Sequence, residues 1–520
     1  MKNLRKFLYV TFIYLFSFVI YSDPSFRIDS SSIIGTQSPN NIDIYLGVPF
    51  AEPPINQLRW EKTKPKVFNK DKYYAKKFAP ACMQGPRIVN WYKGVASGFG
   101  GDPEYISMPE ISEDCLYLNM WVPKNNDQDS KTPVLVFIHG GSNRAGWSFE
   151  PNYIGEELAE EGVIVITVAY RLGVFGFYSH PQLDVSNFAI LDLIEALKWI
   201  KNNISKVGGD PSNITISGES AGATNVAHLI TSPLSKNLFQ RAIHQSAGWS
   251  VLDNDIIHSN DHIKLSNLLS EELLGVNNDT AQVKDLKKID ANDLLNAAEK
   301  IYGYTGYYPI VDNYSILEPI YDSFKSGNFN HVDLIIGSNA DEEKMYLEKD
   351  YFLDDFYNER ESWGFYSDTD DIDSILLNFK GDKEKLNFLL SSRNYVCPSY
   401  FIAKSIVERT NKNVWFYSFD KVRDGKKSKE MGAYHGAELP YIFNTHDYWL
   451  PTSETDHKIT KAIQDFWFNF TKRGNPNSVD DTWIKFQPSL FNVLSFNKDI
   501  SMKKSTSIDV CKELGFIKYQ

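Results

Sequence analysis

Buried strands that alternate with helices are the feature that most limits how this 520-residue chain can fold. Residues 134–138 (Val-Leu-Val-Phe-Ile) and 163–168 (Val-Ile-Val-Ile-Thr-Val) are apolar runs typical of parallel strands covered on both faces. Between residues 187 and 206 apolar residues recur at helical spacing, and Gly-Gly-Asp-Pro at 208–211 ends that helix. A third buried strand follows at 214–216. This order predicts a strand–helix–strand crossover and an α/β sheet.

The rest of the chain contains no repeat, linker or low-complexity tract that would divide it. Residues 253–301 have a mostly helical, charged pattern, which predicts an insertion lying over the sheet. Strand patterns return at 334–336 and 414–419, and residues 458–472 have the spacing of an amphipathic helix. We therefore predict one domain over residues 23–520.

The third strand leads directly into Gly218-Glu219-Ser220-Ala221-Gly222, and a helical pattern follows from residue 223 to 230. Gly-x-Ser-x-Gly between a strand and a helix is typical of a sharp turn that exposes a nucleophilic serine hydroxyl. Glycine at the two outer positions lets neighbouring strands and helices approach closely. Ser220 is therefore the candidate nucleophile.

A serine hydroxyl is a poor nucleophile, so it needs a neighbouring base, and the base needs an orienting carboxylate. Of the ten histidines, His435 differs from the others because it lies in a glycine-flanked loop after a strand, Gly-Ala-Tyr-His-Gly. Three carboxylates, Asp341, Glu342 and Glu343, come just after the strand at 334–336. Their spacing does not choose among them.

The chain as a whole resembles the type-B carboxylesterases, a family that includes the cholinesterases. The resemblance runs roughly from residue 27 to residue 502 and implies an α/β-hydrolase fold. Such a fold has a large, mostly parallel central sheet, helices on both faces, and helical insertions over an active-site gorge. The motifs that carry the resemblance, in chain order, are Gly47-Val-Pro-Phe-Ala-Glu-Pro-Pro54, Glu113-Asp-Cys115-Leu-Tyr-Leu-Asn119, the Ser220 pentapeptide, Tyr308-Pro309-Ile-Val-Asp312, residues 339–342, His435-Gly436 with Glu438, and Gly474-Asn-Pro-Asn477.

The resemblance assigns roles that spacing alone leaves open. It implies Glu342 as the acid, His435 as the base and Ser220 as the nucleophile. It also implies an oxyanion hole formed by three backbone amides, those of Gly141, Ser142 and Ala221. Each such donor typically contributes about 10²–10³ in rate.

Four positions depart from the family's pattern. Ser142 and Glu343 stand where the family has glycine, Ala169 where it has asparagine, and Leu193 where it has glutamine. Ser142 keeps an N–H, so we expect the donor to survive if the backbone angles do. Glu343 adds a like charge beside Glu342, which we expect to raise the pKa of one of the pair unless Glu343 points to solvent.

The resemblance also pairs the four cysteines, as Cys82 with Cys115 and Cys397 with Cys511. The first pair would close a loop that contains the glycine-rich residues 94–101. Tyr105 stands where a choline-binding tryptophan would be expected. This favours an unspecific carboxylic-ester hydrolase over a cholinesterase.

The first 22 residues match a secretory signal peptide. Lys2, Arg5 and Lys6 precede an apolar run at 7–20, and the chain becomes polar at Asp23. We predict cleavage of residues 1–22, a secreted product and no membrane span after cleavage. Secretion makes the Asn-x-Ser/Thr sequences candidate glycosylation sites: Asn203, Asn213, Asn278, Asn313 and Asn469.

Composition excludes other functions. Acidic residues outnumber basic ones by 66 to 54, and a net charge of −12 without a basic stripe makes nucleic acid an unexpected partner. The chain contains no His-Glu-x-x-His and no Cys-x-x-Cys, so we expect no metal and no cofactor.

We predict a secreted serine carboxylesterase acting on a small-molecule ester. The alternative, which Ser142 and Glu343 keep open, is a catalytically weak or inactive adhesion or structural module on the same fold.

Overall fold

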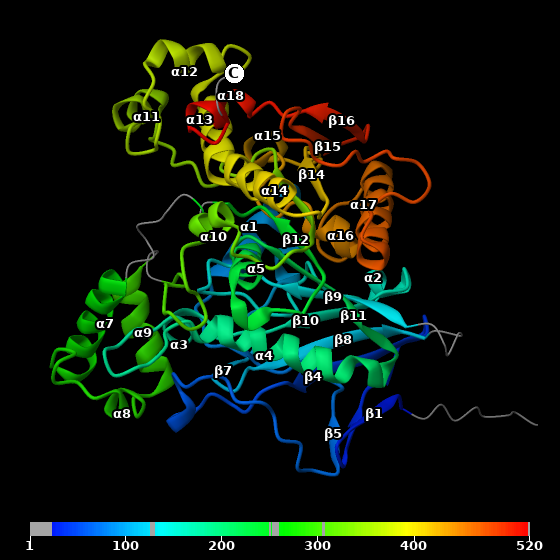
Figure 1. The fold of residues 1–520 in the computed structure, drawn as a ribbon, viewed down its shortest axis with the longest axis vertical. Coiled ribbons are helices and arrows are strands. Elements are labelled where there is room, and N and C mark those ends of the chain that lie inside the picture. Colours follow the sequence, from blue (N-terminus) through cyan, green and yellow to red (C-terminus); the bar gives the residue numbers. More distant parts are fainter. Residues whose placement is uncertain (1–22, 125–130, 249–250, 252–258, 304–306, 518–520) are drawn as a thin grey trace, which may run out of the picture.

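Seven neighbouring parallel strands form the centre of the main sheet of the computed structural model, which describes residues 23–124, 131–248, 251, 259–303 and 307–517 (Figure 1). Antiparallel strands extend the sheet at both ends, so that it has eleven strands within the described residues. The parallel strands, in spatial order, are β10 (Ile164–Val168), β9 (Thr132–Ile138), β11 (Gly209–Glu219), β12 (Arg241–Gln245), β13 (Asp333–Asn339), β14 (Val414–Phe419) and β15 (Asn492–Phe496). The antiparallel strands are β8 (Tyr117–Pro123), β4 (Ile42–Pro49) and β3 (Thr36–Gln37) beside β10, and β16 (Ser501–Lys504) beside β15.

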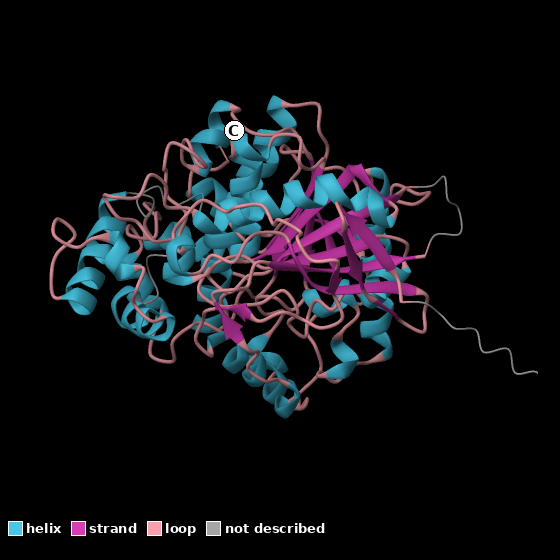
Figure 2. Ribbon diagram, turned by 90° about the horizontal axis from the view of Figure 1, so that it is seen from below, coloured by secondary structure: helices cyan, strands magenta, loops and turns pink. Residues whose placement is uncertain are grey.

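Helices cover both faces of this sheet, as Figure 2 shows. Successive residues of β9 point to opposite faces, and all seven are buried. Val134 and Val136 pack in the core that includes α4 (Phe188–Asn203) and α14 (Cys397–Arg409). Leu135 and Phe137 pack in the opposite core, with α17 (Glu454–Arg473), α2 (Glu156–Glu160) and α16 (Leu439–Phe443). The predicted α/β sheet is confirmed.

Two predicted helices differ from the structure at their ends. The α4 helix stops at Asn203, and a 3-10 turn (Ile204–Val207) and Gly208, at φ +83°, complete the connection to β11. The α17 helix begins before residue 458 because Ser453 and Asp456 form a reciprocal capping box. Strand β11 is also longer than the predicted 214–216, since it pairs with β9 from Gly209 onward.

The predicted helical insertion is present where it is described. It comprises α7 (Ser259–Leu274), α8 (Val283–Leu286) and α9 (Ala291–Tyr302), which lie to one side of the sheet, lower left in Figure 1. Arg59 ties it to the body of the molecule, because its guanidinium donates to the carbonyl of Ile289 (2.7 Å) and pairs with Glu113 (2.6 Å). Residues 252–258 of the predicted insertion lie outside the described residues.

A second helical segment lies at the top of Figure 1. It contains α11 (Leu353–Glu359), α12 (Thr369–Ile375) and α13 (Asp382–Ser391). The π-helical turn η5 (Ser392–Val396) joins α13 to α14. Of these elements, η5 contacts β13.

The predicted signal peptide, residues 1–22, lies outside the described residues, and the single domain over 23–520 stays a prediction. In the part of the chain that is described, no helix combines the length and apolarity that crossing a bilayer requires.

Candidate active site

Ser220 occupies the sharp turn between β11 and α5 (Ala221–Thr231). Its backbone is at φ +56°, a conformation that non-glycine residues adopt only when their surroundings hold them. A Cβ at Gly222 would lie 2.1 Å from the carbonyl oxygen of Ile138, and one at Gly218 would lie 2.5 Å from the backbone of Gly222. Both glycines of the pentapeptide are therefore required for the turn to close against β9.

Three residues far apart in the sequence form one hydrogen-bonded row. The Ser220 Oγ lies 2.8 Å from Nε2 of His435, and Nδ1 of His435 lies 2.7 Å from Oε2 of Glu342. Glu342 follows β13 and is fully buried, and its other oxygen accepts from the backbone N–H of Asn339 (2.6 Å). His435 is 9% exposed. This geometry lets His435 accept the serine proton while a carboxylate holds the ring orientation.

The other two carboxylates after β13 have different partners. Asp341 Oδ2 accepts from the backbone N–H of Ala433 (2.8 Å), and Oδ1 accepts from the side chain of Asn387 (3.0 Å). Glu343 accepts from the side chain of Asn394 (2.7 Å). Of the three candidates, the structure brings Glu342 against the imidazole ring.

Gly141 and Ser142 lie in the loop after β9 and line the same cavity as Ser220. Gly141, Ser142 and Asn143 all have positive φ, at +97°, +58° and +55°. A left-handed conformation costs a non-glycine residue roughly 1–2 kcal/mol, so Ser142 is strained where a glycine would not be. Ala221, the third predicted donor, is the first residue of α5 and is fully buried.

The cavity beside Ser220 has a volume of about 530 Å³. Its wall carries one cation, Arg87, and two buried carboxylates, Glu150 and Glu219. The remaining large side chains of the wall are mostly aromatic: Trp91, Tyr92, Tyr153, Tyr308, Tyr346 and Tyr395. Such a wall can enclose an organic ester of more than acetate size.

Comparison with known proteins identifies the family. The profile of the carboxylesterase family matches residues 22–513. The chain belongs to the carboxylesterase family. Its class of activity is therefore carboxylic-ester hydrolysis, as the sequence analysis predicts.

Relatives of this carboxylesterase cover most of its length. Fumonisin B1 esterase of Sphingopyxis macrogoltabida is 27% identical over 487 residues, which are 86% of this chain and 82% of that protein. Para-nitrobenzyl esterase of Bacillus subtilis (strain 168) is 28% identical over 481 residues, covering 89% and 93%. Acetylcholinesterase of Bungarus fasciatus is 28% identical over 527 residues, covering 93% and 84%. A solved PNB esterase structure superposes with a TM-score of 0.79 at 26% identity, covering 95% and 100% of the two chains, and this confirms the α/β-hydrolase fold.

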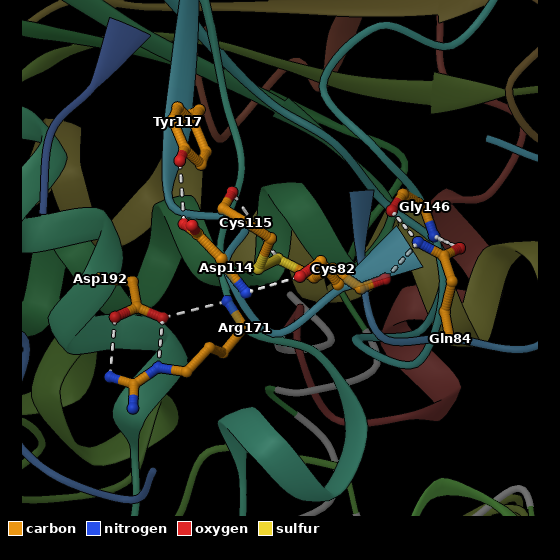
Figure 3. Close-up of a disulfide and its surroundings, with 9 residues drawn as sticks. Cys82, Gln84, Asp114, Cys115, Tyr117, Gly146, Arg171 and Asp192 are labelled. Atoms are coloured by element: carbon orange, nitrogen blue, oxygen red, sulfur yellow. Dashed lines mark hydrogen bonds and ion pairs between the residues drawn. A yellow bond between two sulfur atoms is a disulfide. The ribbon is translucent and has the colours of Figure 1, made fainter. Parts of the chain in front are cut away.

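Both predicted disulfides of the carboxylesterase are confirmed. Cys82 and Cys115 are bonded with Cα atoms 5.0 Å apart, and Cys397 and Cys511 with Cα atoms 5.1 Å apart. Figure 3 shows the first disulfide beside Gln84, whose amide exchanges two hydrogen bonds with the backbone of Gly146 (2.7 and 2.8 Å). The Arg171–Asp192 ion pair in the same view is buried and bidentate. The hydrogen bonds between Gln84 and Gly146 link the disulfide loop to the chain segment that follows Gly141 and Ser142.

The glycine-rich part of that disulfide loop is helical. Residues Arg87–Phe99 form α1, and Gly100 ends it at φ +88°. Its face toward the cavity carries Trp91, which the sequence analysis did not single out. Tyr105, at the position of the expected tryptophan, is 50% exposed and does not line the cavity. The carboxylesterase thus places a tryptophan in its cavity wall from a different position in the chain.

Three buried carboxylates around the site were not predicted as site residues. Burial raises the pKa of Glu219 to about 8, although His435 offsets part of this effect. Burial also raises the pKa of Glu150 to about 7, against hydrogen bonds from Tyr153, Trp147 and Tyr92. Burial and the neighbouring Glu342 raise the pKa of Glu438 to about 6. Glu219 and Glu438 lie within quoted motifs, whereas no local pattern marks Glu150.

Two of these carboxylates, Glu219 and Glu438, act with Glu342 on the pKa of His435. Burial alone would lower the pKa of the imidazole, but Glu219 and Glu342 outweigh it and raise the pKa. Glu219 raises the pKa of His435 in its ionised form, and His435 in turn lowers the pKa of Glu219, so the two groups titrate as a coupled pair. The base strength of His435 therefore depends on the charge of its neighbour.

Glu343 does not point into open solvent. Burial raises its pKa, with a smaller contribution in the same direction from Glu342, while the hydrogen bond from Asn394 lowers it. Asn394 belongs to the π-helical turn η5, which also presents Tyr395 to His435 with ring centroids 5.4 Å apart. The other two departures from the family's pattern, Ala169 and Leu193, are buried in the apolar core.

One of the five candidate glycosylation sites conflicts with the structure. Asn278 is 6% exposed, and its amide lies 2.6 Å from the hydroxyl of Ser266 and 2.6 Å from that of Ser270. A glycan on Asn278 would have to break this buried cluster, so the structure does not favour this site. Asn313 is exposed, and Asn203, Asn213 and Asn469 are half-buried.

Among the described residues, one group has the spacing of metal ligands. Atoms of His446, Asp447 and His457 lie within 4.8 Å of one another. However, Nδ1 of His446 lies 3.1 Å from the guanidinium of Arg423, and its Nε2 lies 3.3 Å from the hydroxyl of Thr460. Both ring nitrogens are thus engaged, and the adjacent guanidinium opposes a cation.

Proposed function

We propose that this protein is a secreted serine carboxylesterase that hydrolyses esters through Ser220, His435 and Glu342 by way of an acyl-enzyme. The observation that carries the proposal is the continuous row from the Ser220 hydroxyl through His435 to buried Glu342, at 2.8 and 2.7 Å. Gly141 and Ser142 line the same cavity as Ser220, and Ala221 follows Ser220 at the start of α5, which supports their role as oxyanion donors.

The mechanism follows from these roles. His435 Nε2 takes the proton of Ser220 as the serine oxygen attacks the ester carbonyl carbon. Backbone N–H groups stabilise the negative oxygen of the tetrahedral intermediate. The carbon–oxygen bond to the alcohol then breaks, and His435 returns the proton to the departing oxygen. Water repeats the sequence on the acyl-serine, which releases the carboxylic acid and restores the hydroxyl.

Throughout this cycle, Glu342 fixes the imidazole by accepting from Nδ1 and stabilises its charged form. The Tyr-rich wall favours an ester with both an acyl and an alcohol part that can pack against rings. Secretion is supported by the signal-like residues 1–22 and agrees with the two disulfides. Exposed Asn313 is the glycosylation site that the structure accommodates most readily.

The test is hydrolysis of p-nitrophenyl acetate and butyrate by the protein secreted from eukaryotic cells. Ser220→Ala and His435→Ala should each lower kcat by about 10⁴-fold or more, with an initial burst of p-nitrophenol from the wild type only. Ser235→Ala is the control, because Ser235 is a buried, hydrogen-bonded serine that does not line the cavity. The proposal would be overturned if Ser220→Ala kept the turnover of the wild type. It would also be overturned if a folded, secreted wild type showed no turnover. In the second case, an adhesion or structural module is the function left standing.

A further inference from the structure

The loop that carries the two expected oxyanion donors Gly141 and Ser142 has an unusual backbone. Three consecutive residues, 141 to 143, have positive φ, and two of them are not glycine. A Cβ at Gly141 would lie 1.9 Å from the carbonyl oxygen of Ala145, so the loop is tightly folded on itself. Left-handed serine and asparagine in sequence persist only where the surroundings over-determine them.

Asn143 is the residue through which the surroundings hold this loop. Its side chain is fully buried. Its Oδ1 accepts from Nδ2 of Asn225 (2.9 Å), its Nδ2 donates to the carbonyl of Tyr307 (3.1 Å), and its backbone oxygen accepts from the N–H of Gly173 (2.8 Å). Asn143 is thus held from three directions.

Asn225 lies on the helix that the nucleophile begins. It is five residues after Ser220 on α5, whose first residue Ala221 supplies the third expected oxyanion donor. Asn225 is fully buried, so its hydrogen bond to Asn143 is protected from water. This bond joins the loop after β9 to the helix after β11, which are the two separate chain segments that would share the oxyanion.

We propose that Asn143 and Asn225 are positioning residues that fix the two halves of the oxyanion hole relative to each other. The inference rests on the proposed function, since it concerns donors that act on an ester. Neither side chain needs to touch the substrate. Because hydrogen bonds to a developing oxyanion depend steeply on distance and angle, a loop that shifts away from α5 would weaken donation in the transition state more than substrate binding.

Two variants separate this role from general stability. Asn225→Ala removes the donor from the helix side. Asn143→Gly removes the acceptor from the loop side. Glycine adopts φ +55° without strain, so this variant can keep the backbone conformation of the loop. It therefore provides a test even if Asn225→Ala folds poorly. The matched control is Asn187→Ala. Asn187 is 1% exposed and clamps Ile310 by hydrogen bonds of 2.7 and 2.9 Å, without a bond to the oxyanion loop.

The measurements are kcat and KM for p-nitrophenyl butyrate, and the inhibition constants of a trifluoromethyl ketone and of the corresponding secondary alcohol. The ketone forms an oxyanion on Ser220, whereas the alcohol does not. We expect Asn225→Ala and Asn143→Gly each to lower kcat by about 10- to 100-fold, a fraction of the loss of a whole donor. The ketone should bind weaker by a similar factor, while KM and alcohol binding stay within about two-fold of wild type.

The double variant provides a further criterion. If the two side chains act through their mutual bond, combining Asn143→Gly with Asn225→Ala should be no worse than the more damaging single change. The proposal would be overturned if ketone affinity and kcat stayed within about two-fold of wild type in both single variants. It would also be overturned if Asn187→Ala showed the losses expected of those two variants. That result is distinct from an inactive wild type, which would overturn the proposed function itself.

Discussion

Glu219 Oε1 lies 3.3 Å from Nε2 of His435, the same ring nitrogen that lies 2.8 Å from the Ser220 hydroxyl. The residue just before the nucleophile in the chain therefore shares its partner. Glu219 is 6% exposed, and it also borders Gly436, where a Cβ would lie 3.6 Å from both Glu219 and Trp91. A carboxylate in this position stabilises the protonated form of His435 whenever it is ionised itself.

The first prediction concerns the pH dependence of kcat/KM. Glu219→Gln removes a carboxylate that raises the pKa of His435, so the imidazole should lose its proton at lower pH. The acidic limb of the profile should move down by about one unit. The control is Glu348→Gln, which changes an exposed carboxylate that follows β13 in the chain. It should leave the acidic limb of the profile unchanged. An acidic limb that stays in place or moves upward in Glu219→Gln would contradict this electrostatic coupling.

The second prediction concerns the strain at Ser142. Ser142→Gly should raise the melting temperature, because glycine adopts φ +58° without the cost of roughly 1–2 kcal/mol that serine bears. Since the donor is a backbone N–H, kcat should stay within a few-fold of wild type. Ser142→Val should lower kcat by about 10²-fold or more, because a β-branched residue cannot hold this backbone and the donor is displaced. A ten-fold loss of kcat in Ser142→Gly would instead give the serine hydroxyl a part in the reaction.

The third prediction concerns Glu343 and stability. Its pKa in the folded state is raised above the ordinary value of 4.5, chiefly by burial. Its contribution to stability is therefore present below pH 4.5 and is lost as the pH rises through the raised value. Glu343→Gln keeps an oxygen for Asn394 and cannot ionise, so its melting temperature should equal wild type at pH 4 and exceed it at pH 8. Equal melting temperatures at both pH values would mean that Glu343 is solvated.

The fourth prediction concerns the start of α17. Burial alone would raise the pKa of Asp456, but hydrogen bonds from Ser453 and Tyr441 outweigh it and lower the pKa to about 2. This stabilisation is present above the ordinary value of 3.8 and is lost as the pH falls through about 2. Asp456→Asn should cost about 2 kcal/mol of stability at pH 7, and the deficit should shrink toward pH 2. Asp465→Asn, which changes a half-exposed carboxylate on the same helix, is the control. A constant deficit at all pH values would exclude the ionic origin.

Local motifs predict Ser220 and His435, and the resemblance to the family chooses Glu342 from the three carboxylates after β13. The parallel strands β11 and β13, with β12 between them, then deliver Ser220 and Glu342 to one edge of the sheet. The left-handed backbone of Ser142 could not be read in the same way. It depends on Asn225, which is 82 residues beyond Asn143 in the chain.

The glycine-rich residues 94–101 show how tertiary packing can form a helix where the local preference is weak. Glycine usually weakens a helix, yet Val89, Tyr92, Val95 and Ala96 are buried at helical spacing and pack α1 onto the core. Gly98 lies against Met431, whose sulfur would be 2.9 Å from a Cβ there. Tertiary packing thus overrode a local preference. Trp91 could not be placed in the cavity wall without knowing that this segment is a helix.

Cys397 follows directly after the π-helical turn that holds Tyr395 against His435, and its disulfide to Cys511 anchors that turn to α18 (Ile508–Glu513). The choice of expression host therefore affects the active-site wall itself. A bacterial cytosol keeps thiols reduced, and a preparation made there would have this wall unanchored while the central sheet still forms. Weak turnover of such material would result from the missing disulfide and not from the catalytic residues. Turnover should therefore be measured on the oxidised protein.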